Sequence, residues 1–149
     1  MFAWRVAGDP GTVYLLGSIH VGKPDLYRLP QPIEQAFAVS PELVKEIDTS
    51  GSNLALLQQQ VLQRGLYTGG DKLEEATTTR AVREHPELQP LIEALVYQRN
   101  AAMARQVADF LKTPKTRFVV VGSLHLVGDR SILKLLAEKG YRIEQLRVQ

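Results

Sequence analysis

Short apolar runs, rich in β-branched residues, occur near both ends of the chain, and each predicts a buried strand. The first covers residues 12–16 and is closed by Gly17, and the second covers residues 43–47. Toward the C-terminus, residues 117–121 form the clearest run. Residues 141–146 alternate between apolar and polar side chains, which is typical of a half-exposed strand. The strand signals therefore form two groups that are far apart in the sequence.

Apolar residues at helical spacing lie between the two strands of each group. Residues 32–39 carry a proline in their first turn, where helices favour it, and apolar side chains at three- and four-residue intervals. Residues 131–139 show the same spacing, and Gly140 stands where a helix commonly ends. Each group therefore has the order strand, loop, helix, strand, which is a βαβ unit.

The stretch between the two groups is largely helical in its pattern. Apolar residues recur every three or four positions over residues 53–66 and 86–111. Residues 73–84 are less periodic and predict a weaker helix or a loop. We therefore expect a mostly helical segment between the βαβ units.

The length and composition fit one domain. With 149 residues, of which 44% are hydrophobic, the chain can bury one sizeable core, and it has no low-complexity linker. We therefore expect a single α/β domain in which two pseudo-symmetric βαβ halves form one central sheet. The expected parts are a first half at residues 1–48, a helical middle region at residues 49–112 and a second half at residues 113–149.

Charge and cysteine content narrow the classes of partner. A formal net charge of +2 is far below the basic excess of a dedicated nucleic-acid binder, so we expect no nucleic acid. Because the chain has no cysteine, disulfides and thiolate metal ligands are excluded. No apolar run approaches the roughly 20 residues that cross a bilayer, and the first residues do not form a secretion signal. The sequence leaves open the compartment, exported or cytoplasmic, and the oligomeric state, a homo-oligomer included.

The first strand of each half is followed by a motif of the form Gly-Ser-apolar-His. Residues 17–20 read Gly-Ser-Ile-His, and residues 122–125 read Gly-Ser-Leu-His. Because ligands of parallel α/β sheets bind outside the carboxyl ends of the strands, we expect His20 and His125 to share one polar site. The residues predicted to contact a bound ligand or cofactor from these turns are Gly17, Ser18, Gly122 and Ser123.

Other polar residues are weaker candidates. Glu46 lies near the end of the second predicted strand, on the same edge as His20, although a solvated residue on an edge strand is an equally good interpretation. Asp48 is the alternative candidate for the carboxylate of the site. His85 precedes a proline in a polar turn and is interpreted as solvent-exposed.

The residue types allow several chemistries. Two neutral imidazoles and one carboxylate can hold a divalent ion and leave positions for water and substrate. The same groups can instead act without a metal, with one histidine as general base, or bind a peptide, a metal or haem without turnover. A third alternative uses Ser18 or Ser123 as a nucleophile, although neither lies in a Gly-x-Ser-x-Gly turn. An HExxH zinc helix, which would be a stronger signal, is absent.

Taken in order, these motifs resemble the TraB/GumN family, which is related to the Tiki membrane-associated proteases. Residues 14–22 are similar to the first GxxH motif of the family, and residues 119–128 to the second. Residues 43–48 resemble its glutamate-bearing strand, and Arg99 with Asn100 resembles its Arg-Asn helix. Without this resemblance, Arg99 and Asn100 would be interpreted as the solvated face of a helix.

The resemblance implies a metal-dependent hydrolase, peptide-cleaving in the Tiki branch, that acts on a peptide or small-molecule substrate. It implies a divalent ion of the manganese, cobalt or zinc class, held by His20, Glu46 and His125. It also adds Arg99 and Asn100 to the catalytic set. In this interpretation Arg99 stabilises developing negative charge, and Asn100 is its hydrogen-bonding partner at the site.

Two features depart from the family pattern. Gln98 stands where an acidic residue usually precedes the Arg-Asn pair. The middle region, here residues 49–97, is shorter than in typical members. The shorter region motivates the alternative of a binding module in the same cleft.

Overall fold

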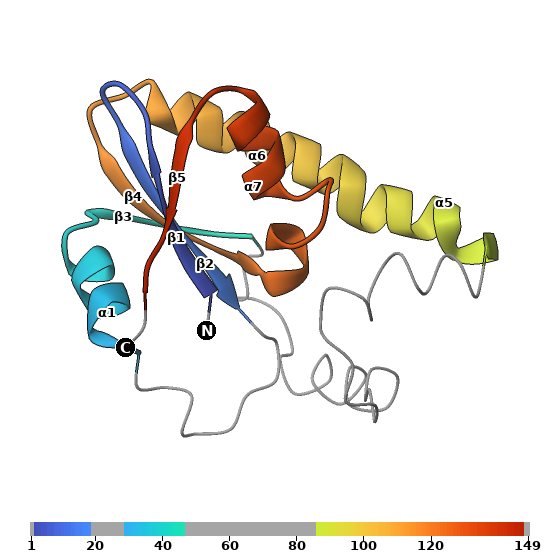
Figure 1. Ribbon diagram of the computed structural model, residues 1–149, viewed down its shortest axis with the longest axis horizontal. Coiled ribbons are helices and arrows are strands. Elements are labelled where there is room, and N and C mark those ends of the chain that lie inside the picture. Colours follow the sequence, from blue (N-terminus) through green and yellow to red (C-terminus); the bar gives the residue numbers. More distant parts are fainter. Residues whose placement is uncertain (1, 19–28, 47–85, 148–149) are drawn as a thin grey trace.

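A mixed five-stranded sheet forms the centre of the protein. A computed structural model describes residues 2–18, 29–46 and 86–147 of the chain (Figure 1). Within these residues the strands lie in the order β3-β4-β2-β1-β5. β2 pairs with β4 in parallel, as does β3, whereas β1 runs antiparallel to both β2 and β5. The strands are β1 (Phe2–Ala7), β2 (Thr12–Ser18), β3 (Glu42–Lys45), β4 (Thr116–Gly122) and β5 (Arg142–Gln145).

Helices follow the periodic segments of the sequence, so the predicted α/β class is confirmed. The long helical run of the middle region changes from 3-10 to α, then to π and back to α geometry. The described helices are α1 (Gln31–Ala38), η2 (Pro86–Leu88), α5 (Gln89–Ile92), the π-helical η3 (Glu93–Tyr97), α6 (Gln98–Leu111), the short 3-10 helix η4 (Ser123–Leu126) and α7 (Ile132–Glu138). Gly140 follows α7 with a φ of 86°, which confirms its predicted place just past the helix end.

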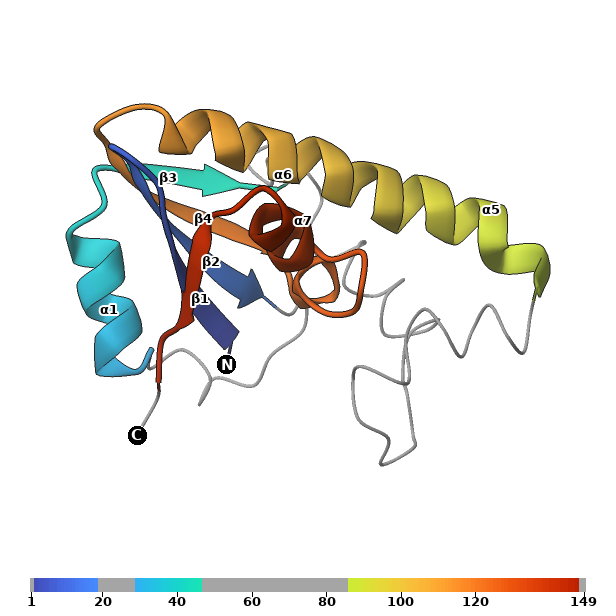
Figure 2. The ribbon, with the colours of Figure 1, turned by 45° about the horizontal axis from the view of Figure 1, so that its top comes forward.

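The helices cover the two faces of the sheet unequally. α1 lies on one face, and α6 and α7 lie on the other (Figure 2). Successive strand residues point to opposite faces, so Leu15 and Val119 join the larger core under α6 and α7, whereas Leu16 and Phe118 pack against α1. Both faces of β2 and β4 are therefore buried, which explains their nearly continuous apolar sequences.

The two predicted halves interleave in the sheet. The chain passes from β2 through α1 to β3, on the far side of β4, and from β4 through α7 to β5, on the far side of β2 and β1. β4 of the second half therefore lies between the two strands of the first half. Because β2 and β4 are parallel neighbours, Ser18 lies opposite Gly122, and the two Gly-Ser turns begin at the same edge of the sheet.

β1 is a strand that the sequence analysis did not predict. Its apolar run is interrupted by Arg5, whose guanidinium lies 3.3 Å from the carboxylate of Glu144 on β5. A turn joins β1 to β2, and in it the N–H of Gly8 donates to the carbonyl of Gly11 at 2.9 Å. These two glycines around Asp-Pro are the signal that could have identified the hairpin.

Several sequence predictions concern parts of the chain outside the described residues. They include the helical segments at 53–66 and 73–84, and the side chains of His20, Asp48 and His85. Among the helices that the structure describes, none is long and apolar enough to cross a membrane.

Candidate active site

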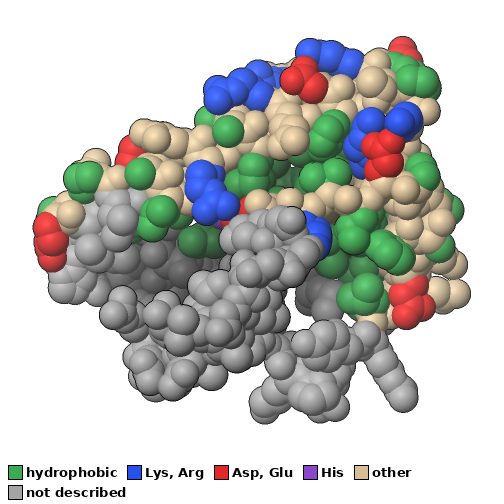
Figure 3. Space-filling view, turned by 180° about the vertical axis from the view of Figure 1, so that it is seen from behind, with side chains coloured by type: hydrophobic (Ala, Val, Ile, Leu, Met, Phe, Trp, Pro, Cys, Tyr) green, Lys and Arg blue, Asp and Glu red, His purple; other side chains and the backbone are tan. Residues whose placement is uncertain are grey.

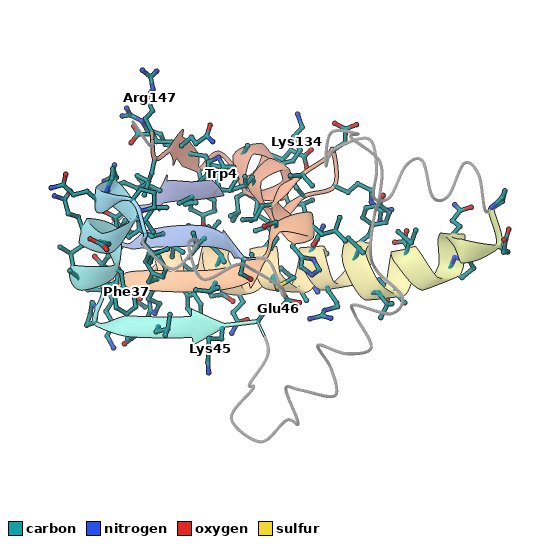
Figure 4. All side chains as sticks on the ribbon, turned by 90° about the horizontal axis from the view of Figure 1, so that it is seen from below. Trp4, Phe37, Lys45, Glu46, Lys134 and Arg147 are labelled. Carbon is teal, nitrogen blue, oxygen red and sulfur yellow. The ribbon has the colours of Figure 1, made fainter. Side chains whose placement is uncertain are left out.

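Glu46 stands immediately after β3, at the edge where the parallel strands end. Its N–H donates to the carbonyl of Val120 at 3.0 Å, which continues the pairing with β4. The alternation along the strand puts the Glu46 side chain on the α6 face, together with Val44. Figure 4 shows Glu46 beside α6, whereas Lys45 points away from the sheet. Only 9% of the Glu46 side chain is exposed, so Glu46 is not a solvated residue of an edge strand.

Groups from β4 and α6 converge on the Glu46 carboxylate. The N–H of Gly122, at the end of β4, donates to Oε2 at 2.7 Å. Arg99, in the first turn of α6, donates from Nη2 to Oε1 at 2.5 Å. A buried carboxylate needs such donors because burial without them is costly. The two bonds therefore hold Glu46 in one orientation at the end of the sheet.

His125 meets the same carboxylate from η4. Its Nε2 lies 3.2 Å from Oε1 of Glu46, and its Nδ1 lies 2.6 Å from Oδ1 of Asn100. The Asn100 side-chain nitrogen donates to the carbonyl of Arg130 at 2.8 Å, so its oxygen is the atom that faces the histidine ring. An amide oxygen can only accept, so Nδ1 is a donor, both in the neutral ring and in the imidazolium.

This arrangement leaves Nε2 of a neutral His125 with a lone pair directed at the Glu46 carboxylate. Two acceptor atoms at that distance attract each other only through a cation, which is either a proton on Nε2 or a metal ion. Metal bonds to histidine nitrogen and carboxylate oxygen are about 2.0–2.2 Å long, so two ligand atoms 3.2 Å apart can share one ion. The donor set of this pair therefore fits a divalent metal.

The third predicted ligand, His20, lies outside the described residues. Within the described parts of the chain, no group of three or more His, Asp or Glu side chains is placed to hold a metal ion. The structure therefore brings together four of the five predicted catalytic residues, and it tests the ligand set only for the pair Glu46 and His125.

The glycines and serines of the two turns have structural contacts. The Ser123 hydroxyl donates to the carbonyl of Ser18 at 2.9 Å, and the Ser18 hydroxyl donates to the carbonyl of Val121 at 3.1 Å. A Cβ atom on Gly17 would lie 3.1 Å from the Ser123 hydroxyl oxygen, which is closer than side chains normally approach. Both serines thus connect the two strand ends, and their contact with a bound ligand stays a prediction.

A clamp around Arg130 supports the site and was missed by the sequence analysis. Its guanidinium forms two 2.7 Å hydrogen bonds with the Glu93 carboxylate and stacks over the Tyr97 ring, 4.0 Å from its centroid. The hydrogen bonds from Arg130 hold the pKa of the Glu93 carboxyl below its ordinary value. Both partners lie in the π-helical segment η3, a type of helix that often marks functional sites. The spacing of apolar residues predicts a helix over residues 86–111 but does not distinguish π-helical from α-helical geometry. The sequence therefore contains no signal for the contact between Arg130 and this segment.

Comparisons with known proteins identify the family of the chain. The sequence matches the TraB/PrgY/gumN family over residues 2–84 and 75–145. A curated protein of Amphimedon queenslandica, named a metalloprotease TIKI homolog, is 30% identical over 77 residues. The aligned part is 50% of this chain, and the chain spans only 14% of the length of that relative. No solved structure matches the chain significantly. Since the family match includes both Gly-Ser-apolar-His motifs, the glutamate strand and the Arg-Asn helix, the chain belongs to the TraB/PrgY/gumN family.

Proposed function

We propose that the protein is a metal-dependent hydrolase that cleaves a peptide or another amide bond. The observation that carries the proposal is the pair formed by Glu46 Oε1 and His125 Nε2, 3.2 Å apart, with the ring proton held on the opposite nitrogen. Such a pair offers two deprotonated ligands to one cation. The name of the metalloprotease TIKI homolog supports the same reaction class.

Glu46 and His125 would hold the ion together with His20. A divalent ion bound there would supply Lewis-acid activation of water and of the scissile carbonyl. Asn100 keeps the His125 ring turned toward Glu46, because its Oδ1 accepts a hydrogen bond from the other ring nitrogen, Nδ1. The N–H of Gly122 donates a hydrogen bond to Oε2 of the carboxylate, which leaves Oε1 as the atom that faces the histidine.

Arg99 would stabilise the negative charge that develops on the substrate oxygen. Its side chain is 41% exposed, whereas that of its partner Glu46 is 9% exposed, so the guanidinium has one side on the buried carboxylate and the other toward solvent. A guanidinium has five N–H donors, and among the described residues the hydrogen bond to Glu46 uses one of them, so others can serve a substrate. A positioned cation of this kind lowers the energy of an oxyanion in the transition state.

The decisive test is metal content and peptide hydrolysis for the native chain and for His20→Ala, His125→Ala and Glu46→Gln. We expect each change to lower metal affinity by more than the roughly 10–100-fold that follows loss of a residue that only supports a ligand. Lys112→Ala is the control, because Lys112 belongs to an exposed ion pair with Asp109 outside the site. Unchanged metal binding in both histidine variants would rule the proposal out. Normal metal binding by the native chain without hydrolysis of any peptide would favour the non-catalytic binding module.

A further inference from the structure

An apolar cavity opens beside the Glu46–Arg99 ion pair, between β3, β4 and α6. Its volume is about 220 Å³, and both members of the ion pair line it. Val121 of β4 and Ile132 of α7 belong to the buried core and also line the cavity. Seen from behind, hydrophobic side chains gather around a hollow in the surface (Figure 3). The cavity therefore connects the larger core with the candidate catalytic groups.

The cavity has the Glu46–Arg99 ion pair at one end and mostly apolar walls, with Gln106 and Lys45 as the other polar lining residues. Arg99 is bonded to Glu46 at the end of β3, whereas Phe110, three turns along α6, lies under Arg117 at the start of β4. Between these ends Met103 of α6 and Val44 of β3 supply apolar walls. An apolar pocket with a few polar groups at one end is the usual form of a site for a small ligand group.

The size of the cavity limits what can occupy it. A volume of 220 Å³ lies below the roughly 300–1,000 Å³ of pockets that hold a drug-sized ligand, and well above the roughly 30 Å³ of one water molecule. It is therefore suited to one side chain. The cavity is open to solvent at exposed residues of α6 and β3, so a side chain can enter it from outside.

We propose that this cavity binds one apolar side chain of the substrate, of the size of leucine, methionine or phenylalanine, next to the bond that is cleaved. That the side chain lies next to a cleaved bond rests on the proposed function, whereas binding of the side chain in the cavity does not. Three observations support this occupant: the mostly apolar lining, a volume that suits one side chain, and Glu46 and Arg99 among the lining residues. A specificity site of this kind would select peptides by one residue beside the cleavage point.

The chain offers a direct probe of the cavity, because it contains two methionines, Met1 and Met103, and the second lines the cavity. Methionine labelled with carbon-13 in its methyl group then reports binding in an NMR titration. The ligands are the N-acetyl amides of glycine, alanine, leucine and phenylalanine, added to the full chain without metal. We expect the leucine and phenylalanine amides to shift the Met103 signal in a saturable manner, and the glycine amide to leave it unchanged.

Blocking the mouth of the cavity supplies the matched comparison. Ala102 is exposed on α6 and lines the cavity, so Ala102→Trp should fill its entrance without disturbing the core. We expect binding of the leucine amide to weaken by at least about tenfold, as loss of burial of one apolar side chain predicts. Ala137→Trp makes the same change at an exposed position of α7 and should bind like the native chain. If Ala102→Trp unfolds, which circular dichroism would show, Ala102→Leu takes its place.

The outcomes separate this inference from the proposed function. A Met103 signal that no amide moves, or that the glycine amide moves equally, overturns the inference even if peptides are hydrolysed. The inference also fails if the cavity variant binds the leucine amide as tightly as the Ala137→Trp control. A saturable response to the leucine amide, without hydrolysis of any peptide by the metal-loaded protein, upholds the binding site and rejects the proposed function.

Discussion

Asn100 shows how one buried side chain can set the chemistry of its neighbour. It is 1% exposed and uses both ends of its amide, the nitrogen on the carbonyl of Arg130 and the oxygen on Nδ1 of His125. Since the amide cannot reverse without placing two donors or two acceptors together, the histidine has one favourable neutral form. The orientation of His125 is therefore set by a residue bonded to the ring nitrogen opposite the one that faces Glu46.

Replacement of Asn100 by alanine tests this role. We expect the free energy of unfolding to fall by about 1–3 kcal/mol, because the buried Nδ1 donor of His125 and the carbonyl of Arg130 lose their partner. Metal affinity should also fall by about 10–100-fold, as expected for loss of the residue that orients a ligand. Urea denaturation and metal titration measure the two effects. Gln98→Ala, at an exposed position of the same helix, is the control, and equal stability of the two variants would contradict the role.

At the scale of elements, the edge strand β3 is fastened to β4 at its start by an ion-pair cluster. The Glu42 carboxylate accepts from Nε of Arg117 at 2.5 Å and from Nζ of Lys115 at 2.6 Å. The hydrogen bond from Lys115, followed by that from Arg117, holds the pKa of the Glu42 carboxyl below its ordinary value. This cluster fixes the start of the short strand that carries Glu46 at its end.

The lowered pKa of Glu42 gives a dependence of stability on pH. Its contribution is present above the ordinary carboxyl value of 4.5, where the group is ionised in folded and unfolded chains, and is lost as the pH falls through the lower folded value. Glu42→Gln should therefore lower Tm at neutral pH, and the difference should vanish well below pH 4.5. Asp109→Asn, in an exposed pair, should change Tm little at either pH. A constant difference across the pH range would contradict the assignment.

The Arg130 clamp connects the loop before α7 to η3 and makes Arg130 a positioning residue. Arg130→Lys keeps the charge but cannot form the paired hydrogen bonds and the flat stacking of a guanidinium. We expect kcat to fall by about tenfold or more with little change in KM, since misplacement of reacting groups by about 1 Å costs on the order of 10²-fold. The Nδ1 proton resonance of His125 should broaden in parallel. Arg142→Lys, in an exposed pair with Glu144, is the control, and an unchanged resonance would contradict the role.

At the scale of the molecule, the interleaved sheet joins groups that are distant in the sequence. β4 lies between β2 and β3, so Gly122 of the second half reaches Glu46 of the first half. α6 then crosses the same edge and adds Arg99 and Asn100. The candidate site therefore belongs to the whole fold and to neither half alone.

Apolar periodicity predicted most of the described elements, because burial on both faces leaves a clear signal. The runs that became β2 and β4, and the spacing that became α6 and α7, are strong for this reason. β1 escaped prediction because Arg5 at its centre pairs with Glu144 at the sheet surface. The Arg130 clamp escaped because it depends on π-helical geometry and a contact between two distant segments.

The sequence by itself determined the α/β class, the two Gly-Ser-apolar-His turns at strand ends and the candidates Glu46, Arg99, Asn100 and His125, since local pattern and residue type are properties of the chain. Only the tertiary structure decided the strand order, the meeting of Glu46 with His125 and the protonated nitrogen of that histidine. The tertiary structure also determined the position of the cavity beside Glu46 and Arg99. The physical reason is that pairing partners and hydrogen-bond directions depend on segments far apart in sequence, which local pattern does not record.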